Sequence, residues 1–253
     1  MINSTKNIVS EELSSAESVT EIPLGPRWEE LYRDLASMAG ELAHEIRNPL
    51  STIQMSVQLL AEDLETPTKQ ADRRISQKIE VVARECQRLS SILDSFLRMT
   101  RLHQVEGRRV NLNELVAEVL EFSRPRITSS GIILRVDLQA DLPAVCVDED
   151  LWRQAILNLL LNAESASRPG DELMVRTRRD NDVVILDITD TGHGMTDEVR
   201  AQVFRPFFST RQGGTGLGLP ATKRIVEAHG GTIRVESQPS CGTAFRICLP
   251  VDC

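Results

Sequence analysis

A heptad repeat within the first hundred residues limits most strongly what this chain can fold into. Its apolar positions are separated alternately by four and three residues, and they are Ile75, Ile79, Val82, Cys86, Leu89, Leu93 and Phe96. Such spacing is typical of a helix whose apolar stripe packs against another helix. A second stripe precedes it, with steps of three or four residues, at Leu31, Leu35, Met38, Leu42, Ile46, Leu50, Ile53, Val57 and Leu60. Together the stripes predict an antiparallel helical hairpin.

One hairpin alone would leave part of its apolar stripe in water. Pairing two copies into a four-helix bundle would cover the stripe, which predicts a homodimer. The alternative is a hairpin that folds against the rest of its own chain. Pro49 lies inside the first helix and is expected to bend it, and Thr66-Pro67 is expected to end it.

The rest of the chain contains both helix-like and strand-like stretches. Helices are expected over 112–122, 150–166 and 217–229, and strands over 109–112, 132–138, 173–178, 183–189, 232–237 and 243–249. This order predicts an α+β fold with helices layered on one face of a sheet. We therefore expect a flexible acidic leader at 1–26, a helical domain at 27–106 and an α+β domain at 107–253.

Charge and composition argue against several classes of protein. The net charge of -8 disfavours nucleic acid as a partner, because phosphate backbones require a basic surface. No apolar run approaches the roughly 20 residues of a membrane span, and no secretory signal is visible, so we expect a cytoplasmic protein without direct membrane insertion. The five cysteines include no C-x-x-C pair and are expected to be reduced structural residues.

Two glycine clusters lie in the α+β region. Residues 190–194 read Asp-Thr-Gly-His-Gly after an apolar strand, and residues 213–219 read Gly-Gly-Thr-Gly-Leu-Gly-Leu before a helix. Glycine lets a backbone approach a ligand closely, and a helix N-terminus favours phosphate. Either cluster alone is also explained by turns.

Two further features stand beside the clusters. Asn158 and Asn162 lie four apart in an apolar helix, so they share one face and need partners, because an unpaired buried amide costs about 1–3 kcal/mol. Those partners are either neighbouring backbone groups or an Mg²⁺ ion. Residues 203–211 hold three phenylalanines in a segment of loop-like composition, which indicates either a mobile lid or a small satellite core.

The order of these segments, Asn-x-x-x-Asn, D-x-G-x-G, F-x-P-F and G-T-G-L-G-L, resembles the ATP-binding domain of histidine kinases over roughly residues 109–250. This superfamily includes type II topoisomerases, mismatch-repair ATPases and a heat-shock chaperone. The resemblance implies an α/β sandwich of the GHKL (Bergerat) ATP-binding type, with ATP and Mg²⁺ as cofactors.

On the adenine side, the resemblance assigns roles to four residues. Asp190 is expected to accept a hydrogen bond from the exocyclic amine of adenine, and Gly192 and Gly194 are expected to shape the adenine pocket. Thr243 is expected near the water network beside the base.

On the phosphate side, Asn162 is expected to ligate Mg²⁺, with Asn158 beside it, and Arg211 is expected to supply positive charge to the triphosphate. The glycines that let the lid and the following helix approach the phosphates are Gly214, Gly216 and Gly218.

Residues 43–50, Ala-His-Glu-Ile-Arg-Asn-Pro-Leu, carry the second part of the resemblance. Helical geometry directs His44 away from the apolar stripe and into solvent, next to Glu45 and one turn from Asn48. The segment resembles the phosphoacceptor motif of the same kinases, in the form found in their nitrogen-regulation-like branch. It implies that His44 accepts the phosphoryl group, Glu45 acts as base, and Asn48 positions water for a phosphatase reaction. The other histidines are expected to be structural or surface residues, and they are His103, His193 and His229.

The resemblance therefore predicts a protein histidine kinase that phosphorylates His44 and passes the group to an aspartate of a response regulator receiver domain. The alternative is an ATPase switch or clamp of the same superfamily that does not phosphorylate itself. Hydrolases of the superfamily commonly place a glutamate four residues before the first asparagine, and here that residue is Gln154, which favours the kinase.

Overall fold

The computed structural model describes residues 26–65, 71–100, 106–211 and 214–251. The chain divides into two compact units, which part inside the first helix between Glu41 and Leu42. Residues 1–25 of the predicted leader, the predicted turn after Thr66 and His103 lie outside the described residues. The predicted domain boundaries after residues 26 and 106 stay predictions.

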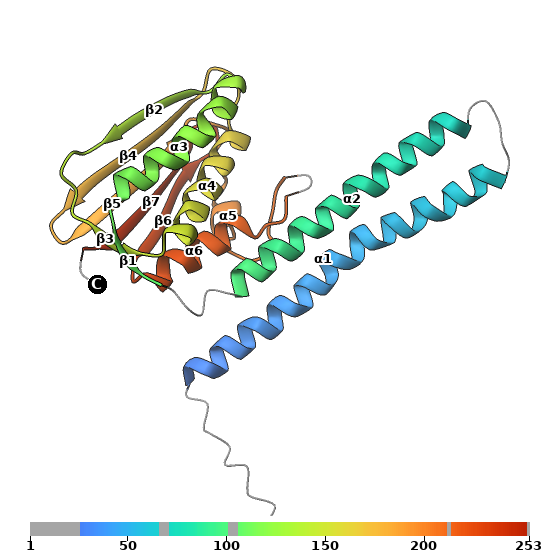
Figure 1. Ribbon diagram of the computed structural model, residues 1–253, viewed down its shortest axis with the longest axis horizontal. Helices are drawn as coiled ribbons and strands as arrows, with labels where there is room; N and C mark the ends of the chain where they lie inside the picture. The colour runs from blue at the N-terminus through green and yellow to red at the C-terminus, as the bar shows by residue number, and fades with distance from the viewer. Residues whose placement is uncertain (1–25, 66–70, 101–105, 212–213, 252–253) are drawn as a thin grey trace, which may run out of the picture. The chain divides into compact units, whose positions relative to one another are not determined.

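Two long helices form the N-terminal part of the chain, as the apolar stripes predict. They are α1, Pro26–Glu65, with Pro49 inside it, and α2, Ala71–Thr100 (Figure 1). Lys78 of α2 donates to the Leu59 carbonyl oxygen at 2.9 Å and to the Asp63 carboxylate at 2.7 Å. Arg74 lies 3.3 Å from the same carboxylate. These contacts join the C-terminal end of α1 to the start of α2, which confirms the antiparallel pairing.

Several apolar side chains of this hairpin remain exposed. They are Leu50, Met55, Val57, Leu59 and Leu64 on α1, and Ile79, Leu93 and Leu97 on α2. Four of them belong to the predicted stripes, at positions 50, 57, 79 and 93. The hairpin therefore leaves its stripe half covered, as expected, and the surplus apolar surface favours burial against another apolar surface.

Residues 106–251 form a sheet with helices on one face, as predicted (Figure 1). Its elements are β1 Arg108–Val110, α3 Leu112–Ser129, β2 Ile133–Leu138, β3 Val145–Val147, α4 Glu149–Ala166, β4 Glu172–Asp180, β5 Val183–Asp190, α5 Asp197–Arg200, α6 Gly218–Ala228, β6 Thr232–Gln238 and β7 Gly242–Pro250. The strand order is β2-β4-β5-β7-β6, with β2 and β4 parallel and the other pairs antiparallel. A separate small sheet pairs β1 with β3.

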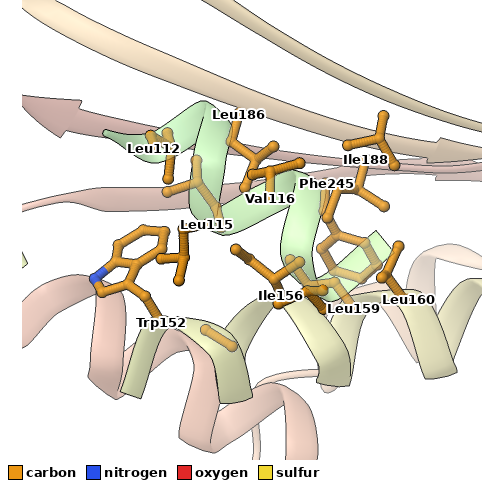
Figure 2. Packing of buried hydrophobic residues seen from close by; sticks show 14 of the residues in the cluster. Leu112, Leu115, Val116, Trp152, Ile156, Leu159, Leu160, Leu186, Ile188 and Phe245 are labelled. Atoms are coloured by element: carbon orange, nitrogen blue, oxygen red, sulfur yellow. The ribbon is translucent and has the colours of Figure 1, made fainter. Parts of the chain in front are cut away.

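The core lies between the sheet and the helices, with α4 at its centre (Figure 2). The labelled side chains are each at most 3% exposed, and they are Leu112, Leu115, Val116, Trp152, Ile156, Leu159, Leu160, Leu186, Ile188 and Phe245. They come from α3, α4, β5 and β7. Because α4 buries a full face here, its opposite face is held in a fixed position.

The structure corrects the sequence expectation at three elements. Helix α3 continues beyond Phe122 and through Pro125, because fully buried Ile127 anchors its last turn to the core. Strand β3 and the short helix α5 were not predicted, since three or four residues are too few to display a periodicity. In the described part of the chain, no helix is both long and apolar enough to cross a membrane.

Candidate active site

Helix α4 carries both asparagines of the predicted nucleotide site. Its N-terminus is capped by Asp148, whose Oδ1 accepts hydrogen bonds from the backbone N–H groups of Asp150 and Leu151, each at 3.1 Å. Asn158 and Asn162 lie one turn apart and are both partly buried. The cap and the buried face of α4 therefore fix where these two amides point.

Asn158 finds its partners within the protein. Its Nδ2 donates to the carbonyl oxygen of Gly218 at 3.2 Å and to the hydroxyl of Thr222 at 3.4 Å. These bonds connect α4 to the N-terminal part of α6. The Nδ2 group of Asn158 is thus paired with a backbone oxygen and a hydroxyl of α6, whereas a role for its amide oxygen beside Mg²⁺ stays a prediction.

Asn162 contacts the segment that precedes α6. Both its Oδ1 and its backbone carbonyl oxygen accept hydrogen bonds from Arg211 Nη2, at 2.5 and 2.8 Å. The two residues are 49 positions apart in the chain. Two residues that were expected to bind metal and phosphate separately therefore lie in direct contact.

Asp190 ends β5 with a buried carboxylate, in a residue only 2% exposed. Its Oδ1 accepts a hydrogen bond from the Gly192 backbone N–H at 3.0 Å. Burial raises the pKa of Asp190, and the amides of Gly192 and Thr243 oppose this rise. The carboxylate is thus held in place by the backbone amides of Gly192, in the loop after β5, and of Thr243, in β7.

The turn between β6 and β7 packs directly on this loop. Gly242 has a φ of +84°, and a Cβ atom placed there would lie 1.9 Å from the Asp190 carbonyl oxygen. Next to it, buried Thr243 shares a 3.0 Å hydrogen bond with Ser237. Only glycine fits this approach, so the turn brings Thr243 against the strand that carries Asp190.

The described residues of the predicted lid, 203–211 and 214–217, bear on the choice between a mobile lid and a small satellite core. Phe204 packs edge-on against Phe245 of the core, with ring centroids 6.4 Å apart, and Lys223 lies 5.7 Å above its ring. Phe208 instead lines a hollow with Arg211. Gly216 has a φ of +65°, and a Cβ there would meet the Phe207 backbone at 2.3 Å. Phe204 therefore packs as a satellite core would, Phe208 lies at the hollow, and the mobility of this segment stays a prediction.

That hollow has a volume of about 270 Å³ and is lined by most of the residues predicted to bind the nucleotide. The predicted residues that line it are Asn158, Asn162, Arg211, Gly214, Gly216, Gly218 and Thr243. Asp190 lines a neighbouring hollow of about 330 Å³, and Thr243 is common to both. A larger hollow of about 370 Å³ lies on the open face of the sheet, where Arg176, Arg246 and Asp187 belong to ion pairs, and it contains no residue of the predicted motifs.

His193 and His229 were both expected to be structural or surface residues, and both are. His193 is exposed, as expected of a surface residue, and it also lines the 270 Å³ hollow, with its Nδ1 2.7 Å from the Gly194 carbonyl oxygen. Its position between Gly192 and Gly194 is the sequence feature that could have placed His193 at the predicted nucleotide site. His229 is structural as expected, because its Nε2 accepts from the Asp148 backbone N–H at 2.9 Å and its ring meets Trp152 edge-on.

The predicted phosphoacceptor segment lies on α1. His44 and Asn48 are exposed, whereas Leu42 and Ile46 on either side of His44 are partly buried, which confirms the expected direction of the imidazole. Glu45 lies 3.7 Å from Arg88 of α2. The segment thus presents an imidazole to solvent beside a carboxylate that an arginine holds.

Two family profiles match the chain. "His Kinase A (phospho-acceptor) domain" matches residues 34–105, and "Histidine kinase-, DNA gyrase B-, and HSP90-like ATPase" matches residues 147–252. Among curated proteins, the sensor histidine kinase ZraS of Klebsiella oxytoca is 38% identical over 219 residues, which are 86% of this chain and 46% of ZraS. The chain thus spans less than half of that relative.

Solved structures agree with these matches. The mycobacterial sensor histidine kinase MprB is 35% identical, with a TM-score of 0.51 over 57% of this chain and 97% of that chain. Histidine kinase ThkA in complex with the response regulator protein TrrA has a TM-score of 0.71 at 25% identity, over 88% of this chain and 64% of that chain. The two matched domains, the helical hairpin and the helix-covered sheet occur in this order in one chain, which belongs to the sensor histidine kinases.

Proposed function

We propose that this chain transfers the γ-phosphoryl group of ATP to His44 and then to an aspartate of a response regulator. The observation that carries the proposal is the meeting of three distant motif segments around one hollow, in a chain that also exposes a histidine beside a carboxylate. Phosphoryl transfer depends mainly on positioning and charge stabilisation, and a preformed pocket supplies both.

The nucleotide is proposed to bind with its adenine toward Asp190 and its phosphates toward Asn162. The Asp190 carboxylate is buried and accepts hydrogen bonds, so it suits the exocyclic amine of adenine, whereas the carbonyl of guanine would face it with a second acceptor. Thr243 stands between the two hollows and is proposed to contact the base side.

The chemistry of the donors at the phosphate end fits Mg²⁺. Within the described residues, no group of three or more His, Cys, Asp or Glu side chains is arranged to hold a metal ion. Mg²⁺ is usually held by one or two protein oxygens together with phosphates and water, and the Asn162 amide oxygen is a suitable ligand of that kind. When bound, the ion would neutralise charge on the phosphates.

His44 is proposed to be the nucleophile. One nitrogen of the neutral imidazole forms the bond to the γ-phosphorus, the bond to the ADP oxygen breaks, and ADP leaves with the electron pair. Glu45 receives the proton from the other ring nitrogen, while Arg88, 3.7 Å away, orients the Glu45 carboxylate. In the second step the group moves from the imidazole to a partner aspartate, and Asn48 positions water when the phosphorylated partner is hydrolysed.

A homodimer and a response regulator are the proposed partners. The exposed apolar side chains of α1 and α2 support the dimer, because a second hairpin would remove them from water. The exposed histidine supports a regulator that docks on the hairpin. TrrA is the regulator that accompanies ThkA, a kinase of similar structure.

The test is incubation of the full chain with γ-labelled ATP. An acid-labile, alkali-stable label on the wild-type protein is expected, and it should disappear in His44→Gln but remain in His103→Gln, the matched control on the other histidine of the predicted helical domain. Release of labelled phosphate without any label on the protein would instead support the ATPase switch or clamp. Transfer of the label to purified response regulators would then identify the partner.

A further inference from the structure

We propose that the open face of the sheet carries a further ligand site, where Arg234 and Arg246 bind the phosphate or carboxylate group of a small molecule. The site is the hollow of about 370 Å³ on the side of the sheet away from α3, α4 and α6 (Figure 1). None of its lining residues belongs to the predicted motifs, so the inference goes beyond the proposed function and does not rest on it.

A row of charged side chains crosses this face and ends in two like charges. From β2 to β6, cross-strand pairing joins in this order Asp137, Arg176, Asp187, Arg246 and Arg234. The signs alternate along the row until its last two members, which are both arginines. Like charges directly opposite each other on neighbouring strands are destabilising, so an anion bound above this pair would complete the alternation.

The acidic residues of this face leave Arg234 without a counter-ion. The Asp187 carboxylate already accepts a hydrogen bond from Arg246 Nε at 2.7 Å, and its other oxygen lies 3.4 Å from Arg178 Nε. Within the described residues, no ion pair includes Arg234, although Glu236 lies two positions later in the same strand. Arg234 is therefore an exposed guanidinium that has a second guanidinium beside it and no carboxylate bound to it.

The two other arginines of the hollow are anchored and still have donors to offer. Arg176 donates to Asp137 at 2.8 Å and Arg246 donates to Asp187 at 2.7 Å, in both cases through Nε. Across the described ranges, no hydrogen bond engages the Nη groups of either side chain. Because one carboxylate fixes each guanidinium, its outer N–H groups are preoriented for a bidentate contact with phosphate or carboxylate oxygens.

The size and lining of the hollow indicate the class of ligand. Its volume of about 370 Å³ falls in the range of about 300–1,000 Å³ that is typical of small-molecule sites. Met174 and Ala244 supply apolar surface, and Thr189 supplies a hydroxyl. Among the charged lining residues, the arginines outnumber the acids by one, in a chain whose net charge is -8. These features fit an organic molecule that carries an anionic group on a small neutral body.

This hollow adjoins the one that contains Asp190. Thr189, Glu236 and Ala244 line both of them. Any test of the arginines must therefore keep the probe out of the proposed nucleotide site. Saturating ADP does so, and if ADP does not bind, there is no nucleotide site for the probe to enter.

The test is a calorimetric titration of the full chain with inorganic phosphate in saturating ADP. Phosphate should bind the wild-type protein, and Arg234→Gln should weaken its binding by about tenfold or more, because a charged hydrogen-bond donor is lost. Arg124→Gln is the matched control, since it removes the same charge from an exposed residue of α3 and should leave the affinity unchanged. Equal losses in both variants, or a loss in neither, would overturn the site.

Two further probes identify the source of the anionic group. Citrate that binds in place of phosphate, with the same sensitivity to Arg234→Gln, would support the site and assign a carboxylate to its ligand. If neither anion binds, the proposal is overturned. Binding of a hexaglutamate peptide alone would also overturn it, because the face would then recognise an acidic protein segment and not a small molecule.

The like-charge pair has a separate test that needs no ligand. In buffer free of phosphate and citrate, Arg234→Gln should unfold at a urea midpoint equal to or above that of the wild type, because one of two repelling charges is gone. A lower midpoint would show that Arg234 stabilises the sheet by itself, which contradicts the argument that this pair awaits an anion.

Discussion

Gly242→Ala should destabilise the ATP-binding domain by about 2–5 kcal/mol. The substituted residue would keep a φ of +84°, which costs an L-residue about 1–2 kcal/mol. Its Cβ would lie 1.9 Å from the Asp190 carbonyl oxygen and 2.8 Å from Thr191 Cα, both backbone atoms that cannot rotate away. Moving the strand to relieve this overlap should cost about a further 1–3 kcal/mol.

Gly230→Ala is the matched control, because it separates the two contributions. Gly230 also has a positive φ, of +72°, but the nearest atom to its Cβ position is Pro250 Cγ at an ordinary 3.7 Å. The control should therefore lose only the conformational part, about 1–2 kcal/mol. Its nucleotide affinity should match that of the unsubstituted protein, since Gly230 lies away from the Asp190 loop.

Urea unfolding followed by tryptophan fluorescence measures both variants. The chain has two tryptophans, and a Trp28→Phe background leaves only Trp152, which is fully buried in the core of the domain. Equal midpoints for the Gly242 and Gly230 variants, at equal slopes, would refute the reasoning, because they would mean that the turn yields without strain to the added methyl group. Gly242→Ala should also weaken ADP binding, since the overlap displaces the residue proposed to contact adenine.

Three further results are expected. His229→Ala should cost about 2 kcal/mol in the same unfolding assay, because the Asp148 backbone N–H loses its acceptor; an unchanged midpoint would mean that water replaces the ring. The hydrogen bond from Lys78 is the main reason that the pKa of Asp63 is lowered below 3.8, so the contribution of Asp63 to hairpin stability is present above that value and is lost as the pH falls below it. Asp63→Asn should therefore flatten the acid limb of a pH titration of the hairpin followed by circular dichroism. An acid limb identical to that of the wild type would contradict the pairing of Asp63 with Lys78. Burial raises the pKa of Asp190 above 3.8, so the affinity for ADP, measured by calorimetry, should fall on acidification at a higher pH than the one at which an exposed aspartate protonates. An affinity that stays constant down to the pH at which an exposed aspartate protonates would exclude the carboxylate as the adenine acceptor.

The long periodic elements could be predicted from the sequence because their signals are local. The start of α4 was predicted within one residue and its end at the residue where the helix ends, because a strongly apolar run marks it. The hairpin between β4 and β5 was marked by polar turn residues at 180–182. The end of α3 was not predictable in this way, because it depends on the burial of Ile127 against distant segments.

In the candidate site, too, the local motifs could be predicted from the sequence, whereas the contacts between distant residues could not. The order of motifs predicted which segments meet, and seven of the ten nucleotide residues line one hollow. The pairing of Arg211 with Asn162 and the bond between His229 and Asp148 join residues 49 and 81 positions apart. Neither contact leaves a periodic or local trace in the chain, so only the folded arrangement reveals them.

The two-sided burial of α4 has a thermodynamic consequence. One face of this helix forms the centre of the core, and the other face carries the asparagines. A change in the shape of the pocket should therefore loosen the core, and loosening of the core should change the shape of the pocket. Ligand occupancy and global unfolding are then linked by mass action: nucleotide at a hundred times its dissociation constant should add about 2.7 kcal/mol to the domain's unfolding free energy. In a cell, the ratio of nucleotide-bound to empty protein would thereby set how long the domain survives proteolysis.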